Sequence, residues 1–141
     1  MEISSSEVVF PTLEQICEVN RTMIDKFGGI FYEPDNLFYR NSLEYILIAI
    51  EFSVGGMQLY PTVKDKAAVL ANTIVAGHVF NDGNKRTGAL ITWQFLNSNQ
   101  KPVFIDNTVE ELLLDMAEGK AGYEEMLDWL HNHQEENSLS G

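Results

Sequence analysis

The chain has 141 residues, of which 45% are hydrophobic and 21% charged, a composition that fits one ordinary globular domain. The net charge of −12 argues against a nucleic-acid-binding protein, because contact with a phosphate backbone requires a basic surface. A lone cysteine, Cys17, excludes an internal disulfide and, with no basic signal-peptide region at the start, indicates a cytoplasmic protein. The apolar run 45–50 is too short to cross a bilayer. We expect a single domain over residues 1–141, with a core at about 12–130 and a polar tail at 132–141.

Helix signals dominate the first part of the chain. Residues 12–15, Thr-Leu-Glu-Gln, form a capping-box pattern, and the apolar spacing after them predicts a helix that ends at Gly28 in a left-handed cap. Residues 41–44, Asn-Ser-Leu-Glu, form a second such pattern and predict a helix to about Phe52. The apolar run 45–50 has little polar face, so we expect this helix to be buried.

The next segment contains a break and then another helix. Gly55 and Gly56 indicate a loop or small hairpin. Thr62, with Asp65 at the third helical position, caps an alanine-rich third helix that continues to about Gly77.

The last part of the chain is also helical. A fourth helix begins near Asn84 and is apolar on most sides, which is typical of a central buried helix. Residues 108–111, Thr-Val-Glu-Glu, predict a further capped helix, and a last helix covers about 121–130. The fold class is therefore all-α, a compact bundle with at most a minor hairpin. Three short segments remain candidates for extended structure: 7–10, 55–60 and 103–105.

The charges are distributed unevenly. Residues 61–101 carry five basic and two acidic side chains, whereas residues 1–60 carry three and nine, and residues 102–141 one and ten. A positive segment in an acidic protein suits a small anionic ligand with several phosphates. A chance arrangement on a solvated acidic surface is the alternative.

Residues 78–87 read His-Val-Phe-Asn-Asp-Gly-Asn-Lys-Arg-Thr and lie in the positive segment. Histidine is the side chain type suited to proton transfer near neutral pH, so His78 can accept a proton from a hydroxyl, and Asp82 offers a hard oxygen ligand for Mg²⁺. Gly83 allows the backbone to approach a phosphate at the start of the fourth helix, where free N–H groups and the helix dipole attract anions.

Other residues of this decapeptide support the same interpretation. Lys85 and Arg86 stand in the first helical turn, where the dipole disfavours cations, and a bound polyphosphate would account for both. Phe80 is expected to point away from its polar neighbours and to anchor the loop in the core. Taken singly, each residue has an ordinary structural reading: a boundary histidine, a common turn, Asn84 as a helix cap and a solvated cationic face.

The decapeptide resembles the signature of the Fic/Doc (Fido) family, His-x-Phe-x-(Asp/Glu)-Gly-Asn-Gly-Arg. The version here has Lys85 in place of the second glycine and looks like the Doc (death-on-curing) branch. The segment 56–67 is similar to the family's flap and the helix after it, so the resemblance places the flap at Gly55, Gly56, Leu59 and Tyr60. The helical order from about Leu13 to Leu130 also fits Doc-like domains.

The resemblance implies a role for each matching residue. His78 would be the general base on a target hydroxyl, with Arg86 also in the catalytic set, and Asp82 would bind Mg²⁺. The phosphates of ATP would be held by Gly83, Asn84, Lys85 and Arg86, and Phe80 would be structural.

The resemblance also implies a reaction. Lys85 fills the space that glycine leaves for the nucleotide in Fic proteins, and Doc-like proteins bind ATP inverted, so that the γ-phosphate is transferred to a Ser/Thr hydroxyl of a protein. For Doc that protein is translation elongation factor Tu. Two alternatives stay open: a Fic-type transfer of AMP or another nucleotidyl group, and a nucleotide-binding interaction module without turnover.

A partner follows from the same resemblance. Many Fic proteins carry an inhibitory helix of the form (Ser/Thr)-x-x-x-Glu-(Gly/Asn). Glu118-Gly119 and Glu136-Asn137 do not fit it, because Leu114 and Asn132 stand where Ser or Thr is needed. Inhibition of a Doc-like toxin is then expected to come from a separate antitoxin. The flap is expected to align a target segment by pairing with it as an added strand. The alternative is that Gly55-Gly56 is a plain turn.

Overall fold

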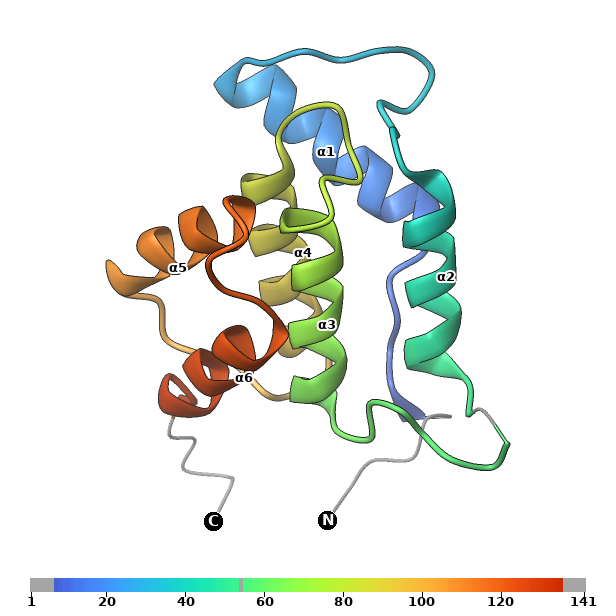
Figure 1. Cartoon of the computed structure of the whole chain (residues 1–141), viewed down its shortest axis with the longest axis vertical. Coiled ribbons are helices and arrows are strands. Elements are labelled where there is room, and N and C mark those ends of the chain that lie inside the picture. The colour runs from blue at the N-terminus through green and yellow to red at the C-terminus, as the bar shows by residue number, and fades with distance from the viewer. Residues whose placement is uncertain (1–6, 54, 136–141) are drawn as a thin grey trace.

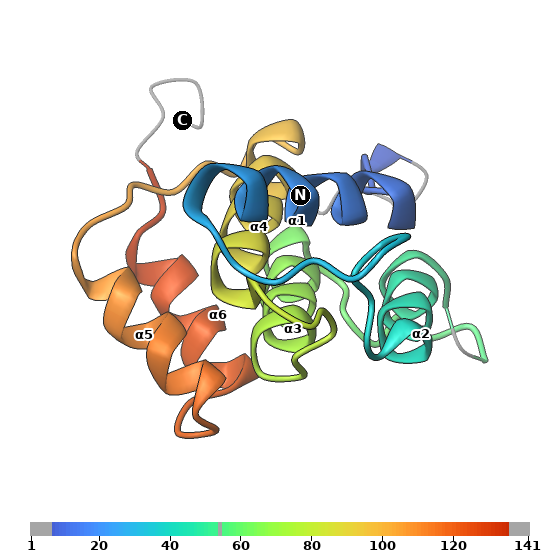
Figure 2. The ribbon, with the colours of Figure 1, turned by 90° about the horizontal axis from the view of Figure 1, so that it is seen from above.

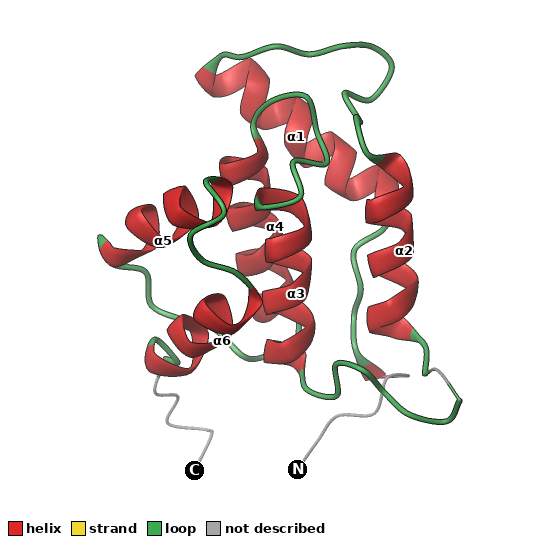
Figure 3. Cartoon of the chain, viewed as in Figure 1, coloured by secondary structure: helices red, strands yellow, loops and turns green. Residues whose placement is uncertain are grey.

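The computed structural model describes residues 7–53 and 55–135, and these residues fold into six α-helices joined by loops (Figure 3). No strand forms within these ranges, which confirms the all-α class. Isolated backbone bridges between described residues include Leu37–Phe80 and Val103–Gln134. None of the helices in the described ranges combines the length and apolar character that crossing a bilayer requires. In chain order the helices are α1 (Leu13–Phe27), α2 (Arg40–Glu51), α3 (Val63–Val75), α4 (Asn84–Ser98), α5 (Thr108–Ala117) and α6 (Tyr123–Asn132).

Helix α3 lies at the centre of the bundle. It runs between α2 on one side and α5 and α6 on the other, with α1 and α4 behind it (Figures 1 and 2). Ten of its thirteen residues are buried, whereas six of the fifteen residues of α4 are. The expectation of a central buried helix is therefore met by α3 more fully than by α4, because the first turn and outer face of α4 stay open.

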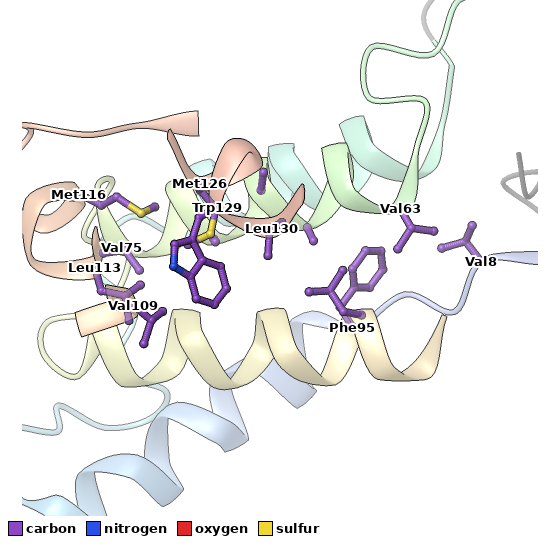
Figure 4. Packing of buried hydrophobic residues seen from close by; sticks show 14 residues of the cluster. Val8, Val63, Val75, Phe95, Val109, Leu113, Met116, Met126, Trp129 and Leu130 are labelled. Carbon is purple, nitrogen blue, oxygen red and sulfur yellow. The ribbon is translucent and has the colours of Figure 1, made fainter. Parts of the chain in front are cut away.

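Two hydrophobic clusters meet on α3. The larger cluster joins α3, α4, α5 and α6, and its side chains fill the space between these helices (Figure 4). The smaller cluster joins α3 to α1, α2, the middle of α4 and residues Val79 and Phe80 of the loop before α4. Close approach of α3 and α4 depends on Gly88, since a Cβ there would lie 2.5 Å from Cγ2 of Val75. The positions of α3 and α4 are thus fixed from both sides, and the loop between them is the decapeptide.

Two of the predicted helix caps are confirmed. The Thr12 hydroxyl accepts a hydrogen bond from the Gln15 N–H at 3.1 Å, and the Thr62 hydroxyl accepts one from the Asp65 N–H at 3.0 Å. Helix α1 ends at Phe27 as expected, but its cap residue Gly28 has φ 87° and ψ 167°, which is not the left-handed helical conformation.

Two other predicted caps are wrong. Helix α2 begins at Arg40, one residue before the predicted box, and no described side chain caps it. Helix α5 begins at Thr108 itself, whose N–H donates to Asp106 at 3.0 Å. The Thr108 hydroxyl is engaged in the tertiary structure instead, where it accepts a hydrogen bond from the Trp129 indole at 2.8 Å. At the start of α5, a carboxylate two residues before Thr108 therefore binds the free N–H, and the Thr108 hydroxyl takes part in a tertiary contact instead of a capping box.

Helix α2 is only half buried, contrary to the expectation from its apolar run. Leu43 and Ile50 are fully enclosed, whereas Tyr45 and Ile48 are 66% and 60% exposed. The physical reason is its place at the edge of the bundle, where only one of its faces contacts α1 and α3 (Figure 1).

The remaining differences concern loops and ends. Residues 55–60 form no strand hairpin; Gly55 and Gly56 turn with φ of 60° and 82°. The buried Lys66 ammonium holds this loop at the base of α3 by donating to the Gln58 amide oxygen at 2.9 Å and to the Tyr60 carbonyl. The last helix runs to Asn132, two residues further than predicted, and residues 136–141 of the predicted tail lie outside the described residues.

Candidate functional site

The decapeptide forms the connection between α3 and α4. After α3 ends at Val75, the chain turns through 76–78, and Val79 and Phe80 then enter the core at 0% and 1% exposed. A second turn leads to Gly83, and α4 begins at Asn84. Two consecutive buried residues, Val79 and Phe80, thus anchor the loop in the core, while His78, Lys85 and Arg86 remain exposed.

A segment that the sequence interpretation left aside, residues 28–39, lies beside this loop. Its backbone pairs with the decapeptide: the N–H of Phe38 donates to the Val79 carbonyl at 2.7 Å, and the N–H of Asn81 donates to the Asn36 carbonyl at 2.9 Å. Leu37 and Phe80 form a bridge in the same stretch. The backbone polar groups of the two segments therefore satisfy one another, and both are held in one arrangement.

Asn84 closes the loop upon itself. Its side-chain oxygen accepts from the Phe80 N–H at 2.9 Å, and its side-chain amide donates to the Phe80 carbonyl at 2.9 Å. These paired bonds occupy both ends of the amide. Asn84 therefore holds residues 80–84 in shape, and the helix cap that was the alternative for Asn84 is formed by Gly83 instead.

A buried amide network, also missed from the sequence, supports the loop from below. Asn20 on α1, fully buried, donates to the Asp82 carbonyl at 2.8 Å and to the Thr87 hydroxyl at 3.0 Å. Its own side-chain oxygen accepts from Asn36 at 2.9 Å. A polar residue between Ile16 and Ile24 on the apolar face of α1 was the signal available in the sequence, since buried amides are retained where they are fully hydrogen-bonded.

The N-terminus of α4 is open to an anion. Gly83 is its N-cap in the left-handed conformation, with φ 77°, and no described side chain caps this end. The first N–H groups of the helix, from Asn84 to Arg86, precede the first intrahelical bond, which is donated by Thr87 to the Gly83 carbonyl at 2.9 Å. N–H groups without an intrahelical partner, the helix dipole and two adjacent cations are together favourable for an anion.

Arg86 has a defined position at this end. Its guanidinium carbon lies 4.4 Å from the centre of the Phe27 ring, at the end of α1. Phe27 is 57% exposed and Arg86 is also exposed, so the pair remains accessible. A guanidinium above an aromatic ring keeps its N–H donors, which are able to bind an anion.

Asp82 is held by backbone donors on both of its oxygens. One oxygen accepts from the Gly83 N–H at 2.8 Å and the other from the Ile30 N–H at 2.9 Å. A Cβ on Gly29 would lie 2.8 Å from the second oxygen, which explains the glycine at that position. A carboxylate offers about four lone-pair positions, so the orientation is fixed while positions for a cation remain.

His78 is exposed and has a left-handed backbone, with φ 49°. Its Nε2 atom lies 3.0 Å from the carbonyl oxygen of Ala117, at the end of α5. A carbonyl oxygen only accepts, so Nε2 carries the proton and the neutral ring has its lone pair on Nδ1. The proton-accepting atom of His78 is therefore Nδ1.

The residues predicted as a flap lie elsewhere. Gly55, Gly56, Leu59 and Tyr60 precede α3, whereas the decapeptide follows it, and α3 spans about 18 Å. Figure 1 shows the two loops at opposite ends of this helix. The Tyr60 ring packs edge-on against Tyr123 of α6 at 5.8 Å. The segment that runs alongside the decapeptide is 28–39.

Two cavities in the described part of the chain lie apart from the decapeptide. One, of about 640 Å³, opens between the segment before α1, α1 itself and the second half of α4. The other, of about 330 Å³, lies between α1 and residues 31–40 and includes Cys17. Neither has a residue of 78–87 in its lining.

Comparison with known proteins bears on this loop. A model of the Fic/DOC family matches residues 10–96, which is more than half of the chain and includes all of 78–87. The toxin Doc of Mycolicibacterium smegmatis is similar, with 37% identity over 68 residues, which cover 46% of this chain and 52% of that protein. The chain thus matches about half the length of this curated relative.

Proposed function

Because this chain belongs to the Fic/DOC family, we propose that it is a Doc-like toxin that transfers the γ-phosphate of ATP to a Ser/Thr hydroxyl of a target protein. The observation that carries the proposal is the open N-terminus of α4, with Gly83 as its cap, Lys85 and Arg86 in its first turn and His78 in the preceding loop. Elongation factor Tu is the proposed target, from the resemblance alone.

Binding of the triphosphate is supported by the donors at this helix end. The backbone N–H groups of the first turn, the Lys85 ammonium and the Arg86 guanidinium all stabilise negative charge. Phosphoryl transfer depends mainly on positioning and on stabilising the charge that spreads over the transferred group. Asn84 serves this arrangement indirectly, because its side chain holds the loop rather than a phosphate.

Mg²⁺ would be held by Asp82 together with the phosphates of the nucleotide. In the described ranges no group of three or more His, Cys, Asp or Glu side chains could hold a metal by itself. Mg²⁺ usually binds through one or two carboxylates plus substrate phosphates and waters, so a single oriented carboxylate fits it. When bound, the ion would neutralise part of the charge on the phosphates.

His78 would act on the target hydroxyl. Its Nδ1 lone pair would accept the hydroxyl proton while the oxygen bonds to the γ-phosphorus and the bond from that phosphorus to the departing ADP breaks. The carbonyl of Ala117, by accepting from Nε2, would hold the ring in the tautomer that this step needs.

The second candidate function is transfer of a nucleotidyl group, as in Fic-type enzymes. Lys85 favours the kinase, since a long cationic side chain stands where the Fic signature has glycine and changes which phosphate can be aligned with the hydroxyl. An antitoxin as a separate inhibitory partner belongs to the same proposal and is supported by the relative's name, toxin Doc.

The proposal can be tested by mass spectrometry of cell-lysate proteins incubated with ATP and Mg²⁺. Wild-type protein is expected to add the mass of one phosphate to a Ser or Thr of one main target, and His78→Ala is expected to add none while remaining folded. Addition of AMP would support the second candidate. Tight ATP binding without any modified protein would indicate a nucleotide-binding module that does not catalyse transfer. Equal modification by the wild type and His78→Ala would exclude His78 as the base.

A further inference from the structure

Helix α2 has an apolar stripe on its outer face. Tyr45, Ile48 and Phe52 are 66%, 60% and 58% exposed, and their spacing of three and four residues aligns them along one side of the helix. The opposite side, with Leu43 and Ile50, is buried against the bundle. Exposed large side chains that line up in this way are uncommon on a surface that meets only water.

Further large side chains are exposed in the segments before and after the helix. Before α2, Phe38 and Tyr39 are 61% and 50% exposed, and their rings contact each other edge-on at 4.6 Å. After α2, Met57 is 68% exposed. Figure 1 places α2 at the edge of the molecule, so the stripe lies on an outer side of the fold.

Charges along one flank of α2 make this surface complementary to itself. Arg40, Glu44 and Glu51 fall within about 40° of one another around the helix. Arg40 is the first residue of α2, where its guanidinium pairs with Asp35 and, at 3.9 Å, with Glu44, and Glu51 is the last residue. If two copies of α2 pack antiparallel, the same flank of each helix faces the other, and Arg40 of one copy comes opposite Glu51 of the other.

We propose that α2 is a homodimer interface, in which two copies of the helix pack antiparallel about a two-fold axis between residues 45 and 46. This register is the one that pairs Arg40 with Glu51, and it brings Phe52 of each copy opposite Tyr39 of the other. A two-fold contact requires a self-complementary patch, which an apolar stripe with opposite charges at its ends provides. The proposal is independent of the proposed enzymatic activity.

The dimer is expected to be concentration-dependent. A stable interface buries roughly 800 Å² on each partner, and a helix of about 18 Å supplies only part of that area. The aromatic pair before α2 and Met57 after it would extend the contact. We therefore expect a dimer that dissociates on dilution, unlike an obligate dimer.

Sedimentation velocity over a range of concentrations tests the association. Wild-type protein is expected to pass from monomer to dimer, and Ile48→Glu is expected to weaken association at least tenfold. Leu114→Glu is the matched control, since Leu114 is 43% exposed on α5, away from α2. Circular dichroism verifies that both variants are folded. A monomer at every concentration, or equal weakening by Leu114→Glu, would overturn the proposal.

The charge pairs are tested by heterodimer rescue. Glu51→Arg and Arg40→Glu each place like charges at both ends of a homodimer, so each variant alone is expected to remain monomeric. An equimolar mixture restores opposite charges at both ends and is expected to dimerise. Failure of the mixture to associate beyond either variant alone would contradict the Arg40–Glu51 pairing.

Cysteine cross-linking tests the antiparallel register. In a Cys17→Ser background, Tyr45→Cys lies beside the axis and is expected to form an intermolecular disulfide on mild oxidation. Phe52→Cys is expected not to cross-link to itself, because its two copies would be about 20 Å apart along the helices. Cross-linking of Phe52→Cys in preference to Tyr45→Cys would indicate a parallel contact and overturn the register.

Discussion

The imidazole Nε2 of His78 lies 3.0 Å from the carbonyl oxygen of Ala117, although the two residues are 39 positions apart. Ala117 is the last residue of α5, where carbonyl groups lack intrahelical partners. The neighbouring carbonyls are satisfied locally: Leu114 accepts from the Glu118 N–H at 3.0 Å and Met116 from the Gly119 N–H at 3.1 Å. The end of α5 is thereby completed by His78.

This contact predicts the tautomer of His78. The neutral ring is expected to carry its proton on Nε2, because the Ala117 carbonyl can only accept. Nitrogen-15 NMR of labelled protein above neutral pH distinguishes the two tautomers directly, and His78→Ala identifies the signal. A ring protonated on Nδ1 would contradict the assignment of Nδ1 as the proton acceptor.

The amide network predicts a large cost for truncating Asn20. Asn20→Ala leaves the Asp82 carbonyl, the Thr87 hydroxyl and the Asn36 amide each short of one partner. We expect a loss of about 2–4 kcal/mol in the free energy of unfolding, since buried polar groups without partners each cost roughly 1–3 kcal/mol. Urea unfolding measures it, with the exposed Asn97→Ala as control; equal stability of the two variants would refute the network's role.

Gly83 and Gly119 form a matched pair for testing how closely the turn before α4 is packed. Both have φ close to 77°, so alanine at either costs about 1–2 kcal/mol in backbone strain. A Cβ on Gly83 would in addition lie 3.0 Å from both the Asn20 amide and Ile24 Cδ1, whereas a Cβ on Gly119 meets nothing within 4 Å. Gly83→Ala is therefore expected to lower the urea midpoint more than Gly119→Ala does, and the reverse order would contradict the crowding described here.

The Asp106 carboxyl is expected to make the free energy of unfolding depend on pH in the acidic range. Hydrogen bonds from Thr108, foremost from its hydroxyl, and the neighbouring His133 lower the pKa of this carboxyl below its usual value. A group with a lowered folded-state pKa stabilises the fold above its unfolded pKa, about 3.9, and that contribution is lost as the pH falls through the folded-state value. Asp106→Asn is expected to be less stable than the wild type at neutral pH, with a difference that narrows on acidification. Urea midpoints at several pH values measure this, and a constant difference would exclude the linkage.

Much of the fold could be predicted from the sequence because its signals are local. Thr12 and Thr62 carry capping boxes whose partners are three residues away, and apolar spacing marked the helices that follow. The prediction failed where distant groups decide. The Thr108 hydroxyl accepts a hydrogen bond from Trp129 instead of capping its helix. Helix α2 lies at the edge of the bundle, and the periodicity of its own residues does not reveal that position.

The candidate site shows the same division. The decapeptide is contiguous, so its chemistry was readable, including Gly83 at the start of α4. The segment 28–39, Asn20 and the Ala117 carbonyl contact it only through the tertiary fold, and the flap was therefore placed at 55–60, beyond the other end of α3. Roles in the site that depend on long-range contacts required the structure.

The most direct measurement for the proposed kinase uses purified protein and purified elongation factor Tu with Mg²⁺ and ATP labelled at either the α or the γ phosphorus. The γ label is expected to reach the target protein, the α label is not, and His78→Ala is expected to transfer neither. Transfer of the α label to the target would contradict the kinase and establish the nucleotidyl transferase in its place.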